Sequence, residues 1–128
     1  MKLLLDTHTL LWWWADDKQL SKAARKAILD EDNTVLVSAA SVWEISTKFR
    51  LGKLPIAKPA IEQFHQLIEA DGFENLPMTW QHSLLAGGYM CAHRDPFDRM
   101  LAAQSEIEKA TLVTCNGTFA EFNTKVFW

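Results

Sequence analysis

The sequence predicts a three-layer α/β fold in which helices flank a mostly parallel central sheet. Short apolar runs of strand length alternate along the chain with longer segments of helical periodicity, which is the pattern of parallel α/β proteins. The chain has 128 residues, the size of one compact domain, and 48% of them are apolar, which is enough for a sizeable core. We therefore expect residues 1–128 to form a single domain.

The first half of the chain is predicted to form two strands and three helices. A short apolar run that ends at Asp6 is typical of a buried parallel strand. Ser21 is a good N-cap for the second helix, and Gly52 is the residue expected just past the end of the third. The predicted elements are a strand over residues 2–5, helices over 7–14 and 22–30, a strand over 34–37 and a helix over 41–51.

The second half is punctuated by prolines and glycines that mark element boundaries. Pro59 and Pro96 suit the first turns of helices, Gly72 suits a helix end, and Pro77 restricts its segment to the edge of a sheet. The predicted elements are a helix from Pro59 to about Gly72, an edge segment over 73–78, helices over about 79–89 and 96–109, a strand over 111–114 and a small terminal strand over 126–128.

Charge and cysteine content exclude several classes of protein. The net charge is -3, so the chain lacks the bulk positive charge of a protein that coats nucleic acid. Its two cysteines form no CxxC pair, which argues against a disulfide framework or a structural zinc site. The longest apolar run, residues 10–15, is too short to span a bilayer. We expect a soluble cytoplasmic protein with no membrane partner.

Polar side chains follow the predicted strands at the points where ligands bind in open α/β sheets. Asp6 follows the first strand, Glu44 lies early in the helix after the second, and Asn116 follows the 111–114 strand. Asp95 and Asp98 begin the helix that leads into that strand. Because the carboxyl ends of parallel strands meet at one edge, we expect these five side chains to lie close together.

Each acid also has a purely structural interpretation, which stays open at this point. Asp6 could cap the following helix, and Ser41 with Glu44 has the spacing of a capping box. Asp95 and Asp98 fit the N-cap and N3 positions of a helix. Taken together, however, several carboxylates at one edge repel one another, and a stable arrangement needs raised pKa values or a bound cation. Oxygen ligands without cysteine or histidine favour Mg²⁺ or Mn²⁺, the ions of phosphoryl chemistry.

Four sequence runs carry a resemblance to a known family. They are LLLDTHTLLWW at residues 3–13, VSAASVWEIS at 37–46, HRDPFDRMLAAQS at 93–105 and LVTCNGTF at 112–119. Together, in this order, they resemble a PIN domain, and more narrowly the VapC-type ribonuclease toxins of bacterial toxin–antitoxin pairs. The run HRDPFDR with its AAQS tail is the most specific of the four.

The resemblance implies an endoribonuclease that depends on Mg²⁺ or Mn²⁺, with Asp6, Glu44 and Asp98 as its first three acids. The fourth acid of the family follows a Thr or Ser by two residues, and here Asn116 takes that place. We expect one well-held ion with Asp6, Asp98 and Asn116 as ligands, because the amide keeps an oxygen but removes a charge. Glu44 would orient the attacking water and act as general base. Asp95 is expected to act as a helix cap.

Weaker hints concern substrate binding. Thr7 could hydrogen-bond a ligand carboxylate or a phosphate, and Arg99 could clamp an RNA phosphate or form a surface salt bridge. Lys48 and Arg50 belong to a basic stretch without acids between Ile45 and Ile61, which we expect to contact RNA.

The aromatic and histidine side chains near these motifs are open to interpretation. Trp12, Trp13 and Trp14 could stack on bases, but consecutive helical positions cannot all point one way, so some should be core or interface. His8 and His93 are expected to be structural or exposed to solvent rather than catalytic.

The resemblance also implies partners: a VapB-type antitoxin protein, a second copy of the chain in a homodimer, and an RNA substrate such as a tRNA or rRNA loop. An alternative is a PIN-like module that binds RNA or protein without cutting, its activity weakened by the loss of the fourth acid. The retained Asp6, Glu44 and Asp98 favour the enzyme.

Overall fold

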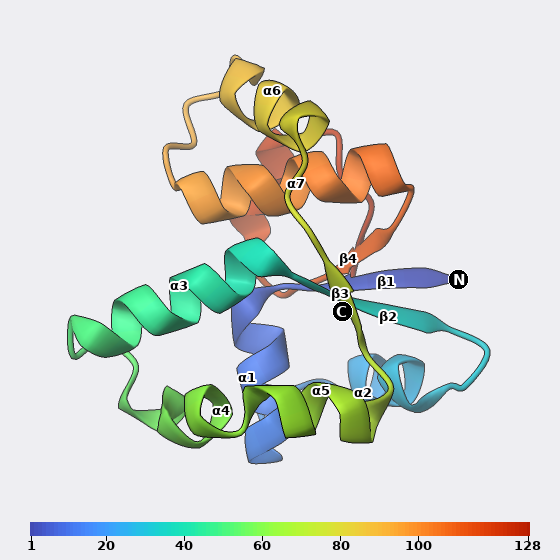
Figure 1. Ribbon diagram of the computed structural model, residues 1–128. Coiled ribbons are helices and arrows are strands. Elements are labelled where there is room, and N and C mark those ends of the chain that lie inside the picture. Colours follow the sequence, from blue (N-terminus) through green and yellow to red (C-terminus); the bar gives the residue numbers. More distant parts are fainter.

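The computed structural model describes residues 1–128 and consists of a five-stranded parallel sheet between two layers of helices (Figure 1). The strand order is β3-β2-β1-β4-β5, and every neighbouring pair is parallel. The strands are β1 (Lys2–Leu5), β2 (Thr34–Ser38), β3 (Glu74–Leu76), β4 (Thr111–Val113) and β5 (Val126–Phe127). The predicted three-layer fold with a mostly parallel sheet is confirmed, and the predicted edge segment is the edge strand β3.

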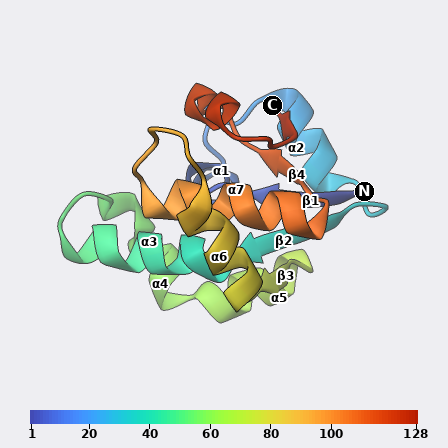
Figure 2. The ribbon, with the colours of Figure 1, turned by 90° about the horizontal axis from the view of Figure 1, so that it is seen from above.

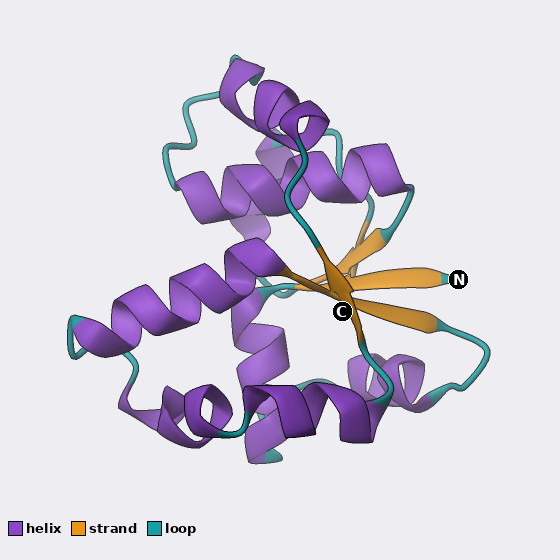
Figure 3. Cartoon of the chain, viewed as in Figure 1, coloured by secondary structure: helices purple, strands orange, loops and turns teal.

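The helices divide between the two faces of the sheet, as the ribbon and the secondary-structure cartoon show (Figures 1 and 3). One face is covered by α1, α2, α4 and α5, and the other by α7, with α6 packed on its outer side (Figure 2). Their bounds are α1 (Thr7–Ala15), α2 (Lys22–Leu29), α3 (Ala39–Arg50), α4 (Lys58–Glu62), α5 (Phe64–Asp71), α6 (Trp80–Gly88) and α7 (Pro96–Glu108). Short 3₁₀ helices, η1 (Pro55–Ala57) and η2 (Gly117–Glu121), complete the chain.

The central strand β1 supplies both hydrophobic cores because successive side chains of a strand point to opposite faces. Leu3 and Leu5 belong to the core beneath α1, α2 and α5, whereas Leu4 belongs to the core beneath α7. All three are completely buried. A strand buried on both faces explains why β1 reads as an unbroken apolar run.

The start of α3 differs from the prediction. The capping box of Ser41 with Glu44 is wrong, because the helix begins at Ala39 and Ser38 is its N-cap, with the Ser38 hydroxyl accepting from the Ala40 amide. Strand β2 therefore runs into α3 without a loop. Ser41 and Glu44 lie inside the helix, where both are buried.

The predicted helix from Pro59 to Gly72 is two helices. Gln63 leaves helical geometry, with φ -120° and ψ 23°, and separates α4 from α5. Gly72 does end α5, in the left-handed conformation with φ 67° that favours glycine. Nothing in the residue types around Gln63 accounts for the break.

The parallel topology brings the segments that follow β1, β2 and β4 to one edge of the sheet. Asp6 leaves β1 and caps α1, while its backbone amide donates to the Val113 carbonyl of β4 at 3.2 Å. The N-terminus of α7 reaches the same edge above the sheet (Figure 1). The longest helix, α7, has 13 residues, and no helix has the length and apolar character needed to cross a membrane.

We expect the Leu4→Ala variant to lose about 2–5 kcal/mol of unfolding free energy, since it leaves a cavity against α7. Leu84→Ala is the matched control, because Leu84 is 68% exposed on α6 and should cost less than about 0.5 kcal/mol. Urea unfolding followed by circular dichroism measures both. Equal destabilisation by the two changes would contradict this description of the core.

Candidate functional site

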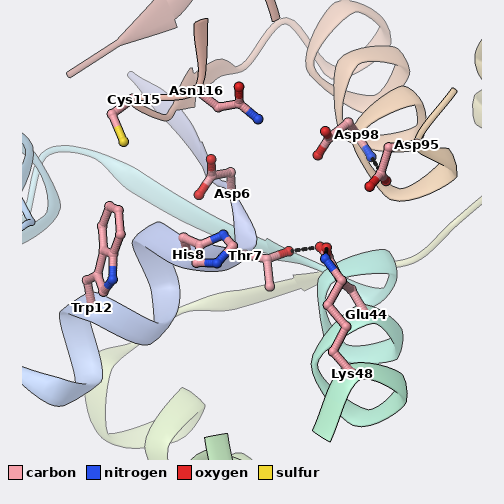
Figure 4. Close-up of a pocket in the computed structure, with 10 residues that line it drawn as sticks. All are labelled: Asp6, Thr7, His8, Trp12, Glu44, Lys48, Asp95, Asp98, Cys115 and Asn116. Carbon is pink, nitrogen blue, oxygen red and sulfur yellow. Dashed lines mark hydrogen bonds and ion pairs between the residues drawn. The ribbon is translucent and has the colours of Figure 1, made fainter. Parts of the chain in front are cut away.

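A cavity of about 360 Å³ opens at the carboxyl edge of the sheet (Figure 4). Its side chains come from the beginning of α1, the middle of α3, the beginning of α7 and the segment after β4. Four of them are carboxylates and one is a lysine. The lining residues are Asp6, Thr7, His8, Trp12, Glu44, Lys48, Asp95, Asp98, Cys115 and Asn116. The five polar residues that the sequence placed at strand ends thus share one cavity.

Asp6 is fixed by donors on both carboxylate oxygens. Its Oδ1 accepts from the Thr9 amide at 2.8 Å, which is the N-cap bond of α1. Its Oδ2 accepts from the Thr114 hydroxyl at the end of β4. Asp6 therefore both caps α1 and lines the cavity, because each of its carboxylate oxygens has a second lone pair that these hydrogen bonds leave free.

Glu44 is 4% exposed, and its charge is balanced within the cavity. Thr7 Oγ1 donates to Glu44 Oε1 at 2.5 Å, and Lys48 Nζ donates to Glu44 Oε2 at 2.5 Å from one turn further along α3. Burial acts to lower the pKa of Lys48, but the hydrogen bond and the charge of Glu44, with the charges of Asp95 and Asp98, raise it above its ordinary value. Lys48 is therefore a firmly charged partner of a buried carboxylate.

Asp98 is held by a histidine from the loop before α7. His93 Nε2 donates to Asp98 Oδ2 at 2.9 Å, and His93 Nδ1 lies 3.6 Å from a carboxylate oxygen of Glu121. Burial raises the pKa of Asp98, the charges of Asp95 and Glu44 raise it further, and the hydrogen bond from His93 opposes the shift. Burial first, and then the neighbouring acids, thus make Asp98 harder to ionise.

Asp95 has the structural role that was expected. Its Oδ1 accepts from the Phe97 and Asp98 amides at 2.9 and 3.1 Å, which makes it the N-cap of α7. Because Asp98 follows in the first turn, this cap also sets the direction in which the Asp98 side chain leaves the helix (Figure 4).

Asn116 lines the cavity, but its side-chain oxygen is already used. Oδ1 accepts from the backbone amide and the hydroxyl of Thr118, at 3.1 and 2.8 Å, and so caps η2. An amide oxygen has two lone pairs. Asn116 could offer this oxygen to an ion only by giving up the cap, so its role as a metal ligand stays a prediction that the hydrogen bonds disfavour.

Arg99 does not line the cavity, and the phosphate contact that the sequence suggests for it stays a prediction. Its guanidinium donates to backbone carbonyls: Nε to Ala86 at 2.8 Å, Nη1 to His93 at 2.7 Å, and Nη2 to Tyr89 at 2.6 Å and Gly87 at 3.4 Å. Five fixed donors make arginine suited to such a fork of acceptors. Arg99 ties the α6–α7 loop to α7 and thereby holds His93 against Asp98.

Two other residues that were predicted to contact substrate differ in where they lie. Lys48 lines the cavity, whereas Arg50 is the last residue of α3, exposed and outside the cavity. Thr7 does hydrogen-bond a carboxylate, as expected. Sequence reasoning missed Thr114 and His93 as partners of the acids, because these contacts join segments that no local spacing pattern connects.

The donor set has the chemistry of a site for a hard cation, without a ready-made cage. No three Asp, Glu, His or Cys side chains converge closely enough to form a metal-binding cluster. Mg²⁺ commonly keeps several waters and uses only one or two carboxylates directly. Asp6 and Asp98, across the cavity from each other (Figure 4), fit an ion held in this way.

Comparison with known proteins adds a family and several relatives. The PIN domain model matches residues 3–125. Ribonuclease VapC16 of Mycobacterium tuberculosis is 36% identical over 59 residues, which is 46% of this chain and 42% of that protein. Ribonuclease VapC22 of the same organism is 34% identical over 67 residues, which is 52% of this chain and 51% of that protein. The matched segments thus span about half the length of these relatives or less.

Several solved structures have a similar fold, and two of them cover nearly the whole chain. The VapBC2 structure from Rickettsia felis, bound to a DNA fragment from its promoter, has a TM-score of 0.73 at 15% identity and covers 100% of this chain and 99% of that chain. FitAcB from Neisseria gonorrhoeae has a TM-score of 0.68 at 20% identity and covers 98% and 96% of the two chains. At these identities the likeness concerns the fold.

We expect Lys48→Met to destabilise the protein by about 1–3 kcal/mol, because it leaves the buried Glu44 carboxylate without its cation. The double variant Glu44→Gln with Lys48→Met should recover part of this loss. Urea unfolding of both single variants and the double variant forms a double-mutant cycle. A coupling energy near zero would contradict the pairing described here.

Arg99→Lys should cost roughly 1–3 kcal/mol of stability, since a lysine cannot satisfy all the carbonyls that the guanidinium bonds. Backbone hydrogen exchange should become faster over residues 87–93, which comprise the end of α6 and the loop after it. Arg94→Lys, at the exposed neighbouring position, serves as the control. Unchanged exchange in this loop would mean that Arg99 does not hold it.

Proposed function

The chain belongs to the PIN domain family, and on this premise we propose that it is a VapC-type endoribonuclease that uses Mg²⁺ or Mn²⁺. The observation that carries the proposal is the gathering of Asp6, Glu44, Asp95 and Asp98 around one cavity at the carboxyl edge of the sheet. Such a concentration of acids is costly unless a cation offsets it. The names of two relatives as ribonucleases support the same activity.

In phosphodiester hydrolysis, different residues of the cavity would bind the ion and activate the water. Asp6 and Asp98 would hold the ion, and their orientation is set by Thr9 and Thr114 for the first and by His93 for the second. When bound, a divalent cation supplies Lewis acidity toward the scissile phosphate and offsets the negative charge of the cavity.

Glu44 is the proposed general base, which orients the attacking water and accepts its proton. Its two oxygens are held by Thr7 and Lys48, so the carboxylate has a fixed direction. The Lys48 side chain is 29% exposed and lines the cavity, where it would contact an RNA phosphate that enters. Arg50, at the exposed end of α3, would contact the RNA backbone outside the cavity.

We further propose that the protein acts as the toxin of a toxin–antitoxin pair, cutting a structured RNA such as a tRNA or rRNA loop and so arresting growth. Its partners would be a VapB-type antitoxin and a second copy of the chain. Support for an antitoxin comes from two solved structures of similar fold, VapBC2 from Rickettsia felis and a toxin–antitoxin complex from Klebsiella pneumoniae. Sequencing of RNA ends after brief expression identifies the RNA and the cut site.

A non-cutting PIN module is the second candidate. It is favoured by one observation: Asn116 takes the place of an acid, and its side-chain oxygen accepts the hydrogen bonds that cap η2. The two candidates differ in their response to metal, because a binding module shows neither RNA cleavage in Mg²⁺ or Mn²⁺ nor growth arrest on expression.

We expect Asp6→Asn and Asp98→Asn each to lower the rate of RNA cleavage in Mn²⁺ by about 100-fold or more, since both remove a charged ligand from the cavity. Removal of the metal with a chelator should abolish cleavage by the wild type. Asp32→Asn, at an exposed turn far from the cavity, should cleave at the wild-type rate. Retained cleavage in the two site variants would refute the assignment.

A further inference from the structure

The cavity has two chemically different ends (Figure 4). Glu44, Asp95 and Asp98 gather with Lys48 toward one end, whereas His8 and Trp12 form the wall at the other, beside Asp6. His8 and Trp12 are four residues apart on α1, so they lie on the same face of the helix. Their ring centroids are 5.7 Å apart, with the planes tilted by 49°.

Trp12 alone of the three consecutive tryptophans lines this cavity. The indole nitrogens of Trp13 and Trp14 both donate to Asp71 Oδ2, at 3.0 and 2.8 Å, which ties these two rings to α5. This confirms that the three rings cannot all point one way. It also leaves Trp12 without a structural hydrogen bond that would account for its place in an acidic cavity.

The aromatic wall is already fixed in position. Trp12 is half-buried against the core and meets Trp128 edge to face, with centroids 5.9 Å apart and planes at 62°. His8, in contrast, is exposed. A ring held in this way can receive a flat ligand with little loss of side-chain entropy.

Electrostatics limits what this end of the cavity can bind. The four carboxylates outnumber Lys48, so a phosphate is repelled as long as no cation offsets their charge. A neutral, flat group avoids this repulsion. Stacking of nucleobases on aromatic side chains is a frequent mode of single-stranded nucleic-acid binding, and it tolerates any base because every base has a π face.

We propose that Trp12, with His8, stacks on one unpaired RNA base next to the phosphate that enters the acidic end. The proposal rests on the nuclease function proposed above and deepens it by naming the substrate as a nucleotide whose base is free of a duplex. A base held in a helical stack has no free face for Trp12, so loops and single strands are selected. Trp12 is then a specificity-determining residue.

The test measures binding without catalysis. A labelled short single-stranded RNA with a cleavage-resistant backbone carries one abasic nucleotide that is moved through successive positions, and fluorescence anisotropy gives its affinity in the presence of Mg²⁺. For the wild type, we expect one position at which loss of the base weakens binding roughly tenfold or more. In Trp12→Leu this position should lose its effect, and in Trp12→Phe most of the effect should remain.

Two further variants make the result specific. Trp80→Ala changes an exposed tryptophan on α6 that does not line the cavity, and it should bind like the wild type. His8→Ala changes an exposed position whose loss leaves the core intact, so it tests the same wall even if Trp12→Leu fails to fold. We expect it to reduce the abasic effect several-fold.

The outcomes separate this inference from the nuclease proposal. An abasic penalty of equal size in the wild type, Trp12→Leu and His8→Ala, or no sensitive position in the wild type, overturns the stacking site even if the protein cuts RNA in Mn²⁺. A sensitive position that depends on Trp12 supports the stacking site even if Mn²⁺ brings no cleavage, in which case the nuclease proposal alone fails.

Discussion

Four carboxylates line one cavity at the carboxyl edge of the sheet, and burial together with the charges of Asp95 and Glu44 raises the pKa of Asp98. Parallel pairing of β1 with β2 and β4 brings their carboxyl ends to one edge, where Asp6 after β1 and Glu44 in the helix after β2 meet Asp95 and Asp98 at the start of α7. Three of these carboxylates accept hydrogen bonds from donors of their own. Asp6 accepts from the Thr114 hydroxyl and the Thr9 amide, Glu44 accepts from Thr7 and Lys48, and Asp98 accepts from His93. The raised pKa of Asp98 shows that burial and its acidic neighbours still outweigh the donor that it has.

The supports of the site reach beyond the cavity. Arg99 gathers backbone carbonyls of α6 and the following loop, and this loop carries His93 to Asp98. Ser38 ends β2 and caps α3, and its hydroxyl also donates to Gln104 of α7 at 2.5 Å, which joins the two helices that supply Glu44 and Asp98. Cap and strand-end residues thus link the elements that carry the acids.

Much of the fold follows from the sequence because it depends on local patterns: the buried run of β1, the Ser21 cap, the Pro96 start of α7 and the Pro77 edge segment. The nearness of Asp6 and Glu44 follows as well, because each comes after a strand whose carboxyl end lies at the same edge of the parallel sheet. The predictions fail in two ways. They choose the wrong one of two possible helix caps, and they miss contacts between residues that are far apart in the sequence. Ser38 and Ser41 are both plausible caps, and only the length of β2 decides between them. No spacing rule reveals that Arg99 faces the α6–α7 loop or that Thr114 faces Asp6.

We propose that these carboxylates bind a divalent cation, and a titration with Mn²⁺ measures this binding without any RNA. Electron paramagnetic resonance of Mn²⁺ in solution reports free ion, so a titration of the purified protein counts the ions that are bound. We expect a saturable loss of the free-ion signal for the wild type and no such binding in the double variant Asp6→Asn with Asp98→Asn. A free-ion signal that the wild-type protein leaves unchanged, or equal binding by the double variant, would contradict it.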